Sequence, residues 1–369
     1  MLKYLRLYRT ICRTFGWRLR PLATFGMLGV QRTVNLATRA ADHVLYPAFR
    51  KRSIDKPVFV LGNPRSGTTF VHRFLLNTDQ LCAFELWEML FPAISARRLL
   101  SGVVEHLAPF SPGRYHSADA HEAGVRDVET DDAMVFLQMM EGGFLWSYFL
   151  AWEDQWGSEQ SRRYFFDKDT KALPNQDRMF RLLEDAWRRN LHHKHKRRII
   201  AKSSLMSLRV EELVRRYPDC RIIYLVRDPL ESIPSGMSLL TGVLEKSYDV
   251  FHATSEERRA RWLENLYQAS LRMYGAFHES WQAGAIPEKN LRIVPYPSIV
   301  NDLQATMTSL LDFLEIEPTP AFLDKLAEQD RLQKTRQSAH TYSLDKFRLS
   351  EDRIRADLDF VYESYGLKS

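Results

Sequence analysis

The stretch Pro57-Val-Phe-Val-Leu-Gly-Asn-Pro-Arg-Ser-Gly-Thr-Thr69 joins a short apolar run to a glycine-containing turn and then to a helical pattern. The run from Pro57 to Gly62 predicts a buried strand, and residues 69–77 repeat apolar side chains with helical spacing. A turn in this position directs backbone N–H groups at an anion, and the helix N-terminus adds a favourable field. We therefore expect an anion-binding loop over residues 63–69.

The loop has the spacing of the P-loop G-x-x-x-x-G-K-[ST], except that Thr68 stands where the lysine belongs. Nucleoside-triphosphate enzymes use that lysine on the β- and γ-phosphates, so its absence argues against an ordinary ATPase or kinase. Arg65 supplies a positive charge from a different position of the loop. The alternative is a glycine turn that only joins the strand to the helix.

Three further short aliphatic runs, at residues 198–202, 221–226 and 291–294, predict strands. Helical patterns over residues 179–190, 205–217 and 254–282 separate them. Strands that alternate with helices in this way predict an α/β fold with a central parallel sheet flanked by helices. Residues 78–178 hold many Trp, Phe and Met residues, which suggests helices that build an acceptor pocket.

A second motif, Arg227-Asp-Pro-Leu-Glu-Ser-Ile-Pro-Ser235, follows the predicted strand 221–226. Parallel sheets bind ligands beyond the carboxyl ends of their strands, and Arg227 is placed at such an end. A helix after Arg227 would bring the Ser235 hydroxyl back to the same place. Together the two side chains would hold a second phosphate through charge-assisted hydrogen bonds.

The two motifs resemble those of the sulfotransferase superfamily, and most closely those of a broad bacterial sulfotransferase family. The resemblance implies the P-loop-like sulfotransferase fold and the donor 3′-phosphoadenosine 5′-phosphosulfate (PAPS). It also implies that Val294-Pro-Tyr-Pro-Ser298 holds the adenine through its tyrosine, although the acidic residues of the family pattern are replaced by Pro297 and Ser298. The donor-binding residues would be Arg65, Ser66, Gly67, Thr68, Thr69, Arg227, Ser235 and Tyr296.

Four shorter segments extend the resemblance over most of residues 57–369. They are Leu86-Trp87-Glu88, Ala201-Lys202-Ser203-Ser204, Asp131-Asp132 and His340-Thr-Tyr-Ser-Leu344. Ser204 replaces a proline of the family pattern. Lys202 would follow the charge of the transferred sulfonate; the alternative is a lysine at a strand end that reaches solvent.

Sulfuryl transfer also needs a base that takes the proton of the acceptor. Glu88 matches the Trp-Glu element of the closer family, and Glu85 lies nearer in spacing to the catalytic glutamate of the tyrosylprotein sulfotransferases. We expect Glu88 to be the base, with Glu85 as the second candidate. A histidine base, as in cytosolic small-molecule sulfotransferases, is the remaining alternative, with candidates His72, His116 and His121.

The charge of this 369-residue chain is concentrated at its N-terminus. Residues 1–56 hold 12 of the 52 Lys and Arg residues but only Asp42 and Asp55 among the acids, a net charge of +10, which leaves −4 for the remainder. The basic character therefore does not indicate a nucleic-acid partner. We expect a basic helical arm at 1–56 and a sulfotransferase domain at 57–369.

The start of the arm has the pattern of an amphipathic helix, with Lys3, Arg6, Arg9 and Arg13 opposite the apolar side chains. Such a helix can lie on an anionic membrane surface. We expect it instead to dock on its own domain, or on a second subunit in a homodimer, because docked amphipathic helices are far commoner. Three scattered cysteines and the lack of a long apolar run predict a cytoplasmic protein, with attachment to the inner face of a membrane as the alternative.

Several other groups have plainer explanations than catalysis. The run His192-His-Lys-His-Lys-Arg-Arg198 is more typical of a solvated basic turn than of a metal site, and the pair Asp131-Asp132 suits a helix N-terminus. Lys334, Arg336 and His340 are candidates for closing over the 3′-phosphate. An aromatic group is expected to be core and, as the alternative, would line an apolar acceptor pocket: Phe144, Trp146, Tyr148, Phe149 and Trp152.

The sequence thus predicts a PAPS-dependent sulfotransferase that needs no metal and acts on a hydroxyl, less readily an amine, of a small-molecule or lipid acceptor. The first alternative is a P-loop kinase acting on a small molecule. The second is a catalytically silent nucleotide-binding protein at a membrane surface.

Overall fold

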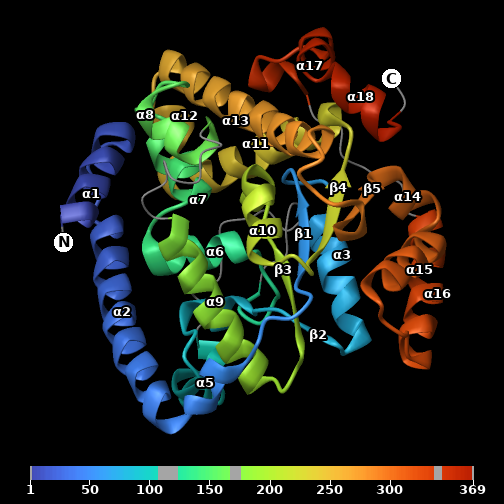
Figure 1. Ribbon diagram of the computed structural model, residues 1–369. Coiled ribbons are helices and arrows are strands. Elements are labelled where there is room, and N and C mark those ends of the chain that lie inside the picture. The colour runs from blue at the N-terminus through green and yellow to red at the C-terminus, as the bar shows by residue number, and fades with distance from the viewer. Residues whose placement is uncertain (1, 107–123, 167–175, 336–342, 368–369) are drawn as a thin grey trace. The chain divides into compact units, whose positions relative to one another are not determined.

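The structure is a computed structural model that describes residues 2–106, 124–166, 176–335 and 343–367 (Figure 1). The chain divides into two compact units. Unit 1 consists of Met1–Ser53, Phe84–His195 and Met237–Gln268. Unit 2 consists of Ile54–Ala83, Lys196–Gly236 and Ala269–Ser369. The division into an arm at 1–56 and a domain at 57–369 remains a prediction.

Unit 2 contains a five-stranded, wholly parallel sheet, which confirms the predicted fold class. Its order is β2-β3-β1-β4-β5, and non-consecutive neighbours require crossover connections through helices. The central strand β1 pairs Val60 with Lys202 of β3 and Gly62 with Leu225 of β4. The strands are β1 (Val58–Gly62), β2 (Leu81–Cys82), β3 (Arg198–Lys202), β4 (Arg221–Val226) and β5 (Leu291–Pro295).

Burial explains why these short segments form the centre of the sheet. Every residue of β1 is buried, and so is β4 apart from its first residue. A strand covered on both faces reads as an unbroken aliphatic run, which is the pattern seen from Val58 and again from Ile222. Because parallel strands end at one edge, the residues after β1, β3 and β4 meet there.

The remaining elements of unit 2 are helices, and α11 and α13 each contain residues of both units. The helices with residues in unit 2 are α3 (Thr68–Leu75), η2 (Leu76–Thr78), η8 (Leu205–Arg209), α10 (Val210–Arg216), α11 (Pro229–Tyr248), α13 (Glu256–Gln282), η9 (Glu288–Asn290), α14 (Tyr296–Asn301), α15 (Leu303–Leu314), α16 (Pro320–Thr335), η10 (Asp345–Phe347), α17 (Glu351–Asp357) and α18 (Asp359–Tyr365).

The described residues of unit 1 are helical or irregular. They are α1 (Leu2–Phe15), α2 (Arg20–Leu45), η1 (Pro47–Lys51), α4 (Leu86–Leu90), α5 (Ile94–Leu100), α6 (Asp131–Met139), α7 (Gly143–Leu145), η5 (Trp146–Leu150), α8 (Glu159–Ser161), η6 (Arg162–Phe166), α9 (Gln176–His193) and α12 (Val250–Ala253). Of these, η5 and η6 are π-helical turns.

Helix α1 has the predicted amphipathic pattern, and its apolar side is covered within unit 1. Leu7, Ile11 and Phe15 are buried, and the Phe15 ring stacks on Tyr248 at a centroid distance of 4.6 Å. Of the alternatives for the start of the arm, the structure thus shows docking on its own chain. Among the described residues, no helix is long and apolar enough to cross a membrane.

Candidate active site

The anion-binding loop leaves β1 at Gly62 and enters α3 at Thr68. Gly62 has φ of 141°, and a Cβ there would lie 2.3 Å from the Leu225 carbonyl oxygen of β4, so only glycine fits. Gly67 has φ of 92° and lies against the Tyr296 ring. Arg65 adopts φ of 71°, which is uncommon for a residue with a side chain and is frequent at functional sites.

The second motif meets this loop. The Arg227 guanidinium donates through Nη1 to the Arg65 carbonyl oxygen at 3.1 Å, and Arg65 Nε donates to Ser235 Oγ at 3.1 Å. The Arg227 guanidinium also lies 4.3 Å from the centre of the Tyr296 ring. The structure therefore brings together Arg65, Arg227, Ser235 and Tyr296, which sequence reasoning placed at two anion sites and an adenine site.

Lys202 reaches the loop from the end of β3. Its Nζ donates to Thr69 Oγ1 at 2.9 Å, and only 6% of the residue is exposed. The register that pairs Val60 with Lys202 sets this position, because the two strands end side by side. The side chain thus points to the loop, unlike a strand-end lysine that reaches solvent.

The side chains of Ser66, Thr68 and Thr69 in the loop differ in burial and in contacts. Ser66 is fully buried, and its Oγ donates to the Asn63 carbonyl oxygen at 2.7 Å, which closes the turn. Thr68 is buried at the first position of α3, whereas Thr69 is partly exposed beside Lys202. The first N–H groups of a helix have no partner within that helix, so the loop points donors to where an anion would lie.

Residues that the sequence analysis did not identify hold Arg227 in place. Tyr274 Oη donates to the Arg227 carbonyl oxygen at 3.0 Å and contacts Ser232 Oγ at 2.8 Å; burial raises the pKa of this tyrosine. Glu231 accepts from Arg227 Nε at 2.7 Å. The i,i+4 spacing of Arg227 and Glu231 could have predicted their ion pair from the sequence. No sequence pattern predicts the contact of Arg227 with Tyr274 of α13.

The two glutamate candidates belong to unit 1 and stand at the start of α4. Glu85 precedes the helix, and its backbone N–H donates to Glu88 Oε2 at 2.8 Å, as in a capping box. Glu88 is 2% exposed. Its Oε2 also accepts from Lys194 Nζ at 2.8 Å, and its Oε1 lies 3.5 Å from Arg97 Nη1. Every oxygen of Glu88 therefore has a cationic partner.

The environments of the two carboxyls shift their pKa values in opposite directions. Burial raises the pKa of Glu85, and repulsion from the Glu88 carboxylate adds to the shift. Its side chain accepts hydrogen bonds from Trp87 Nε1 at 2.7 Å and from the Glu88 backbone N–H, and its Oε2 lies 4.0 Å from Arg126 Nη1. Burial alone would raise the pKa of Glu88 as well, but the charges of Arg97 and Lys194 outweigh it and lower that pKa. Glu85 is thus the better proton acceptor near neutral pH.

Of the three candidate histidine bases, the structure describes only His72. His72 is fully buried in α3, and its Nε2 lies 3.2 Å from the Ile200 carbonyl oxygen of β3. His116 and His121 lie outside the described residues, as do Arg336 and His340. Lys334 is in α16.

The paired acids lie at a helix N-terminus, as expected. Asp131 and Asp132 form the first turn of α6, and Thr130 caps it by accepting from the Asp132 N–H. Asp131 Oδ1 also accepts from Trp187 Nε1 at 2.9 Å. The pair therefore stabilises the helix start in unit 1.

The aromatic group at 144–152 divides into two kinds of side chain. Trp146 and Trp152 are fully buried, and Trp152 stacks on Trp262 at 4.5 Å. These two are core. Phe144, Tyr148 and Phe149 are only partly buried. Tyr148 and Phe149 lie on the π-helical turn η5, a distortion that is frequent at functional sites.

The basic run that starts at His192 spans the end of α9 and the start of β3. His195 and Arg197 are exposed, as expected for a solvated turn, but Lys194 turns back to Glu88. A separate cluster, Glu245, Asp249 and His252, has the spacing of a metal site. Its groups serve local structure, since Asp249 pairs with His252 and Glu245 accepts from the Phe251 N–H.

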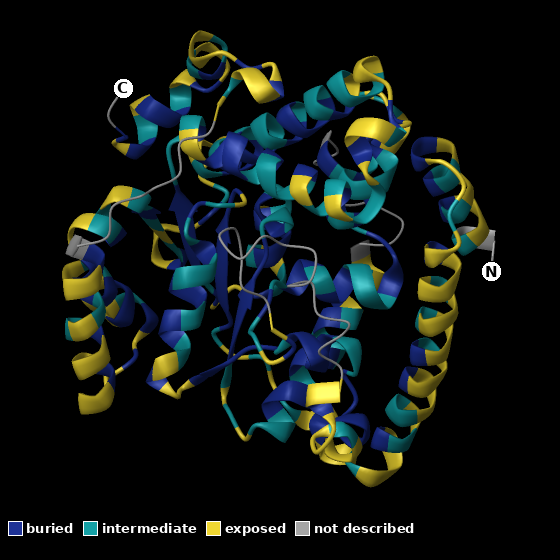
Figure 2. Cartoon of the chain, turned by 180° about the vertical axis from the view of Figure 1, so that it is seen from behind, coloured by how far each residue is buried: buried dark blue, intermediate teal, exposed yellow. Residues whose placement is uncertain are grey.

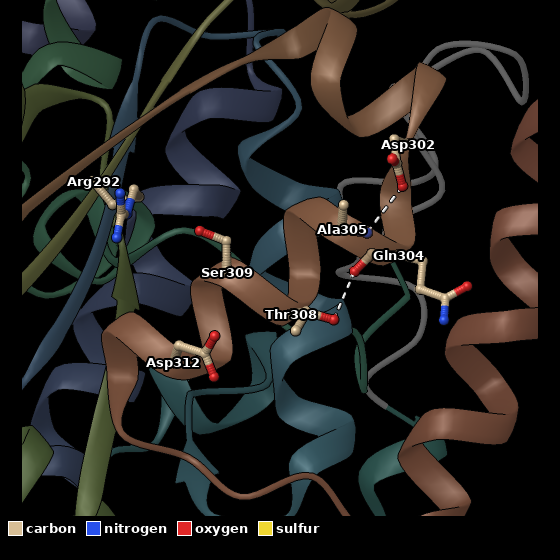
Figure 3. Close-up of a pocket in the computed structure, with 7 residues that line it drawn as sticks. All are labelled: Arg292, Asp302, Gln304, Ala305, Thr308, Ser309 and Asp312. Carbon is tan, nitrogen blue, oxygen red and sulfur yellow. Dashed lines mark hydrogen bonds between the residues drawn. The ribbon is translucent and has the colours of Figure 1, made fainter.

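One open pocket lies on α15, and its lining includes none of the predicted site residues (Figure 3). Its hydrogen bonds are local to the helix: Asp302 accepts from the Ala305 N–H, and Thr308 donates to the Gln304 carbonyl oxygen. Both bonds belong to the turns of α15 itself, so they explain these side chains without a ligand. The lining residues are Arg292, Asp302, Gln304, Ala305, Thr308, Ser309 and Asp312.

Comparison with known proteins adds independent information. A model described as "Sulfotransferase family" matches residues 57–321. Two curated relatives, the omega-hydroxy-beta-dihydromenaquinone-9 sulfotransferases Stf3 of Mycobacterium bovis and Mycobacterium tuberculosis, are each 22% identical over 228 residues, which is 60% of this chain. The chain spans about half the length of these relatives, since the match covers 54% of each.

Two solved structures share the fold. The sulfotransferase STF9 from Mycobacterium avium has a TM-score of 0.69 at 13% identity, over 93% of this chain and 86% of its own. The sulfotransferase STF1 from Mycobacterium tuberculosis has a TM-score of 0.64 at 15% identity, over 96% and 91%. At these identities the likeness concerns the fold, which agrees with the parallel sheet of unit 2.

Proposed function

The chain belongs to the sulfotransferase family, and we propose on that basis that it transfers the sulfuryl group of PAPS to a hydroxyl, less readily an amine, of an acceptor. The observation that carries the proposal is the convergence of Arg65, Arg227 and Ser235. PAPS carries an anionic group at each end, and two linked anion-binding motifs suit such a donor better than a single P-loop does.

Different cations of the donor site would bind different anionic groups of PAPS. Arg65 and the N–H groups at the start of α3 would hold the 5′-phosphosulfate, and Arg227 with Ser235 would hold the 3′-phosphate. The Tyr296 ring, already stacked on Arg227, would support the adenine. Arg227 also keeps its carbonyl bonded to Tyr274. A site fixed in this way loses little entropy when the donor binds.

In the reaction, the acceptor oxygen attacks the sulfur as the bond from sulfur to the bridging phosphate oxygen breaks. The acceptor loses its proton to the base, and adenosine 3′,5′-bisphosphate leaves with the bridging oxygen. Negative charge grows on that oxygen, and Lys202, buried beside Thr69, would stabilise it. Exclusion of water matters as well, because water would otherwise take the sulfuryl group.

We propose Glu85 as the base and Glu88 as the residue that positions it. The sequence favoured Glu88, but its carboxylate is held by Lys194, Arg97 and the Glu85 backbone. A carboxylate in that position is a weak proton acceptor. Glu85 is partly exposed and has a raised pKa, which is what a carboxylate base requires.

The acceptor is proposed to be an apolar or amphipathic molecule with a hydroxyl group. The name of the Stf3 relatives describes an acceptor that is a hydroxylated menaquinone derivative, a lipid. In this chain the partly buried Phe144, Tyr148 and Phe149 offer apolar surface for such a molecule. The arm has two candidate partners of its own, an anionic membrane and a second copy of this chain, and the reaction requires neither.

Turnover of labelled PAPS tests the proposal directly. The purified chain is incubated with PAPS and a panel of long-chain alcohols, hydroxylated quinones, sterols and phenols, and products are detected by mass. A sulfated product that disappears in Glu85→Gln supports the proposal. A phosphorylated product formed with magnesium and ATP would support the small-molecule kinase. Binding of PAPS without any product would support the catalytically silent nucleotide-binding protein.

A further inference from the structure

Helix α2 buries polar side chains and exposes apolar ones, the reverse of what is usual for a surface helix in water. Its buried residues include Gln31, Asn35 and Asp42, which are polar, while its exposed residues are largely apolar. Figure 2 shows long stretches of α2 in yellow, the colour of exposed residues. The large exposed apolar side chains, which we call the outer face of α2, are Leu22, Met27, Val30, Val34, Leu36, Val44 and Leu45.

Polar contacts within unit 1 fix this orientation. Gln31 Nε2 and Asn35 Nδ2 both donate to the Leu90 carbonyl oxygen, at 2.7 and 2.9 Å. Asp42 is fully buried; it accepts from the backbone N–H groups of Ile94 and Ser95 and from Arg189 Nε, the last at 2.8 Å. The helix cannot roll its apolar side inward without breaking these bonds, which are strong when buried.

The charged side chains inside α2 also turn away from the outer face. Arg32 donates to the Gln138 carbonyl oxygen and lies over the Tyr4 ring, and Arg39 pairs with Asp185. From Leu22 to Leu45 the outer face therefore runs about 35 Å, at 1.5 Å per residue, without a charged group. An exposed helix face normally carries charges, and an apolar one of this length marks a docking surface.

Charge identifies the partner. The arm that contains α2 has a net charge of +10, and exposed cations flank the outer face along the chain: Arg6, Arg9, Arg13 and Arg20 before it, Arg50 and Lys51 after it. Trp17, 74% exposed, stands at the N-terminal end. An apolar strip between cationic ends, with tryptophan at one end, is the composition of helices that lie in the headgroup region of anionic bilayers.

A second copy of the chain fits the same face less well. A symmetric pair of these arms would bring two charges of +10 together, a repulsion that an anionic lipid surface converts into attraction. We therefore propose that the outer face of α2 docks on an anionic lipid membrane, with α2 lying in the plane of the surface. The proposal does not rest on the sulfuryl-transfer reaction.

Flotation of the full chain with vesicles tests it. Vesicles of phosphatidylcholine mixed with phosphatidylserine are compared with vesicles of phosphatidylcholine alone. We expect wild type to float with the anionic vesicles, less at high salt. Val30→Glu with Val44→Glu should weaken this binding by at least about tenfold, because two carboxylates would enter the apolar zone. Leu323→Glu, at an exposed apolar position of α16, is the matched control and should bind as wild type does.

Two further measurements separate loss of binding from loss of folding. Thermal unfolding and titration with adenosine 3′,5′-bisphosphate should be unchanged in the double variant, since both positions are exposed; Val30→Gln with Val44→Gln serves if the glutamates disturb the fold. Light scattering reports the oligomeric state. Wild type that does not float, or variants that float equally well, would overturn the proposal. So would a dimer that the double variant splits without any lipid binding.

Discussion

At the scale of single residues, Glu85 and Glu88 show how neighbouring carboxyls acquire different properties. They stand three residues apart, yet Glu88 is enclosed by Arg97 and Lys194 while Glu85 is partly exposed. The sequence placed the two one helical turn apart, and the structure has them at the start of α4. It could not rank them, because the cations around Glu88 come from α5 and from the basic run after α9. Spacing along the chain does not show those contacts.

Glu85→Gln is expected to lower kcat by about 10²–10⁴-fold, because the acceptor loses its base. Bisphosphate affinity should stay as in wild type. Since Glu85 must be ionised to accept a proton and its pKa is raised, kcat/KM should fall with decreasing pH at values above the usual glutamate range near about pH 4.3. Initial rates across pH measure this. Unchanged rates in Glu85→Gln would exclude it as the base.

Glu88→Gln is expected to act on stability instead, since it leaves Arg97 buried without its carboxylate. A loss of about 3 kcal/mol in the free energy of unfolding is the usual scale for breaking a buried pair. The lowered pKa of Glu88 means that its stabilisation is present above the unfolded-state pKa and is lost as pH falls through the folded-state value. The difference from wild type, measured by denaturant unfolding, should therefore shrink in acid. A difference that grows in acid would contradict this account.

At the scale of elements, the parallel sheet was predictable and some details were not. Four strands were predicted to within about one residue because each gives a short aliphatic run; β1, β3 and β4 are almost wholly buried, whereas most of β5 is partly exposed. Strand β2 has only Leu81 and Cys82, too few for any pattern. The helix predicted over 205–217 is η8 followed by α10. The helix predicted over 254–282 begins at Glu256, and Ser255 Oγ accepts from the Arg258 N–H.

The turn from β1 into α3 gives a prediction of its own. In Gly67→Ala the new Cβ would meet the Tyr296 ring at 3.0 Å, and the left-handed backbone adds strain of about 1–2 kcal/mol. We expect bisphosphate affinity to fall by at least about tenfold, because the loop or Tyr296 must move. Gly284→Ala is the control: φ there is also positive, but no atom lies within 4 Å of the Cβ. Equal affinities in both variants and wild type would refute this role of the loop.

At the scale of the whole molecule, residues 1–53 belong to unit 1 and contact its other segments. Residues of α2 hydrogen-bond to segments near 90–95, 138 and 189, and Phe49 of η1 is buried beside Arg189. The sequence predicted the helical start of the arm correctly because α1 is conventionally amphipathic. It could not predict the orientation of α2, since a helix that buries its polar side has the periodicity of one that buries its apolar side.

Asp42→Ala tests this integration. Removing the carboxylate leaves the N–H groups of Ile94 and Ser95 without their acceptor and takes one buried partner from Arg189. The free energy of unfolding should fall by about 3–5 kcal/mol. Asp324→Ala, at an exposed position of α16, should change it by less than about 0.5 kcal/mol. Equal free energies of unfolding in the two variants would show that the contacts of Asp42 do not stabilise unit 1.

The most direct test of the central claim is calorimetric titration of the full chain with adenosine 3′,5′-bisphosphate and, separately, with magnesium–ATP. Wild type is compared with Arg65→Ala and Arg227→Ala. We predict micromolar binding of the bisphosphate that both substitutions abolish and that ATP does not match, because each arginine serves one of two anion sites. Binding of ATP alone, or bisphosphate binding that survives Arg227→Ala, would contradict the assignment of this chain as a PAPS-dependent sulfotransferase.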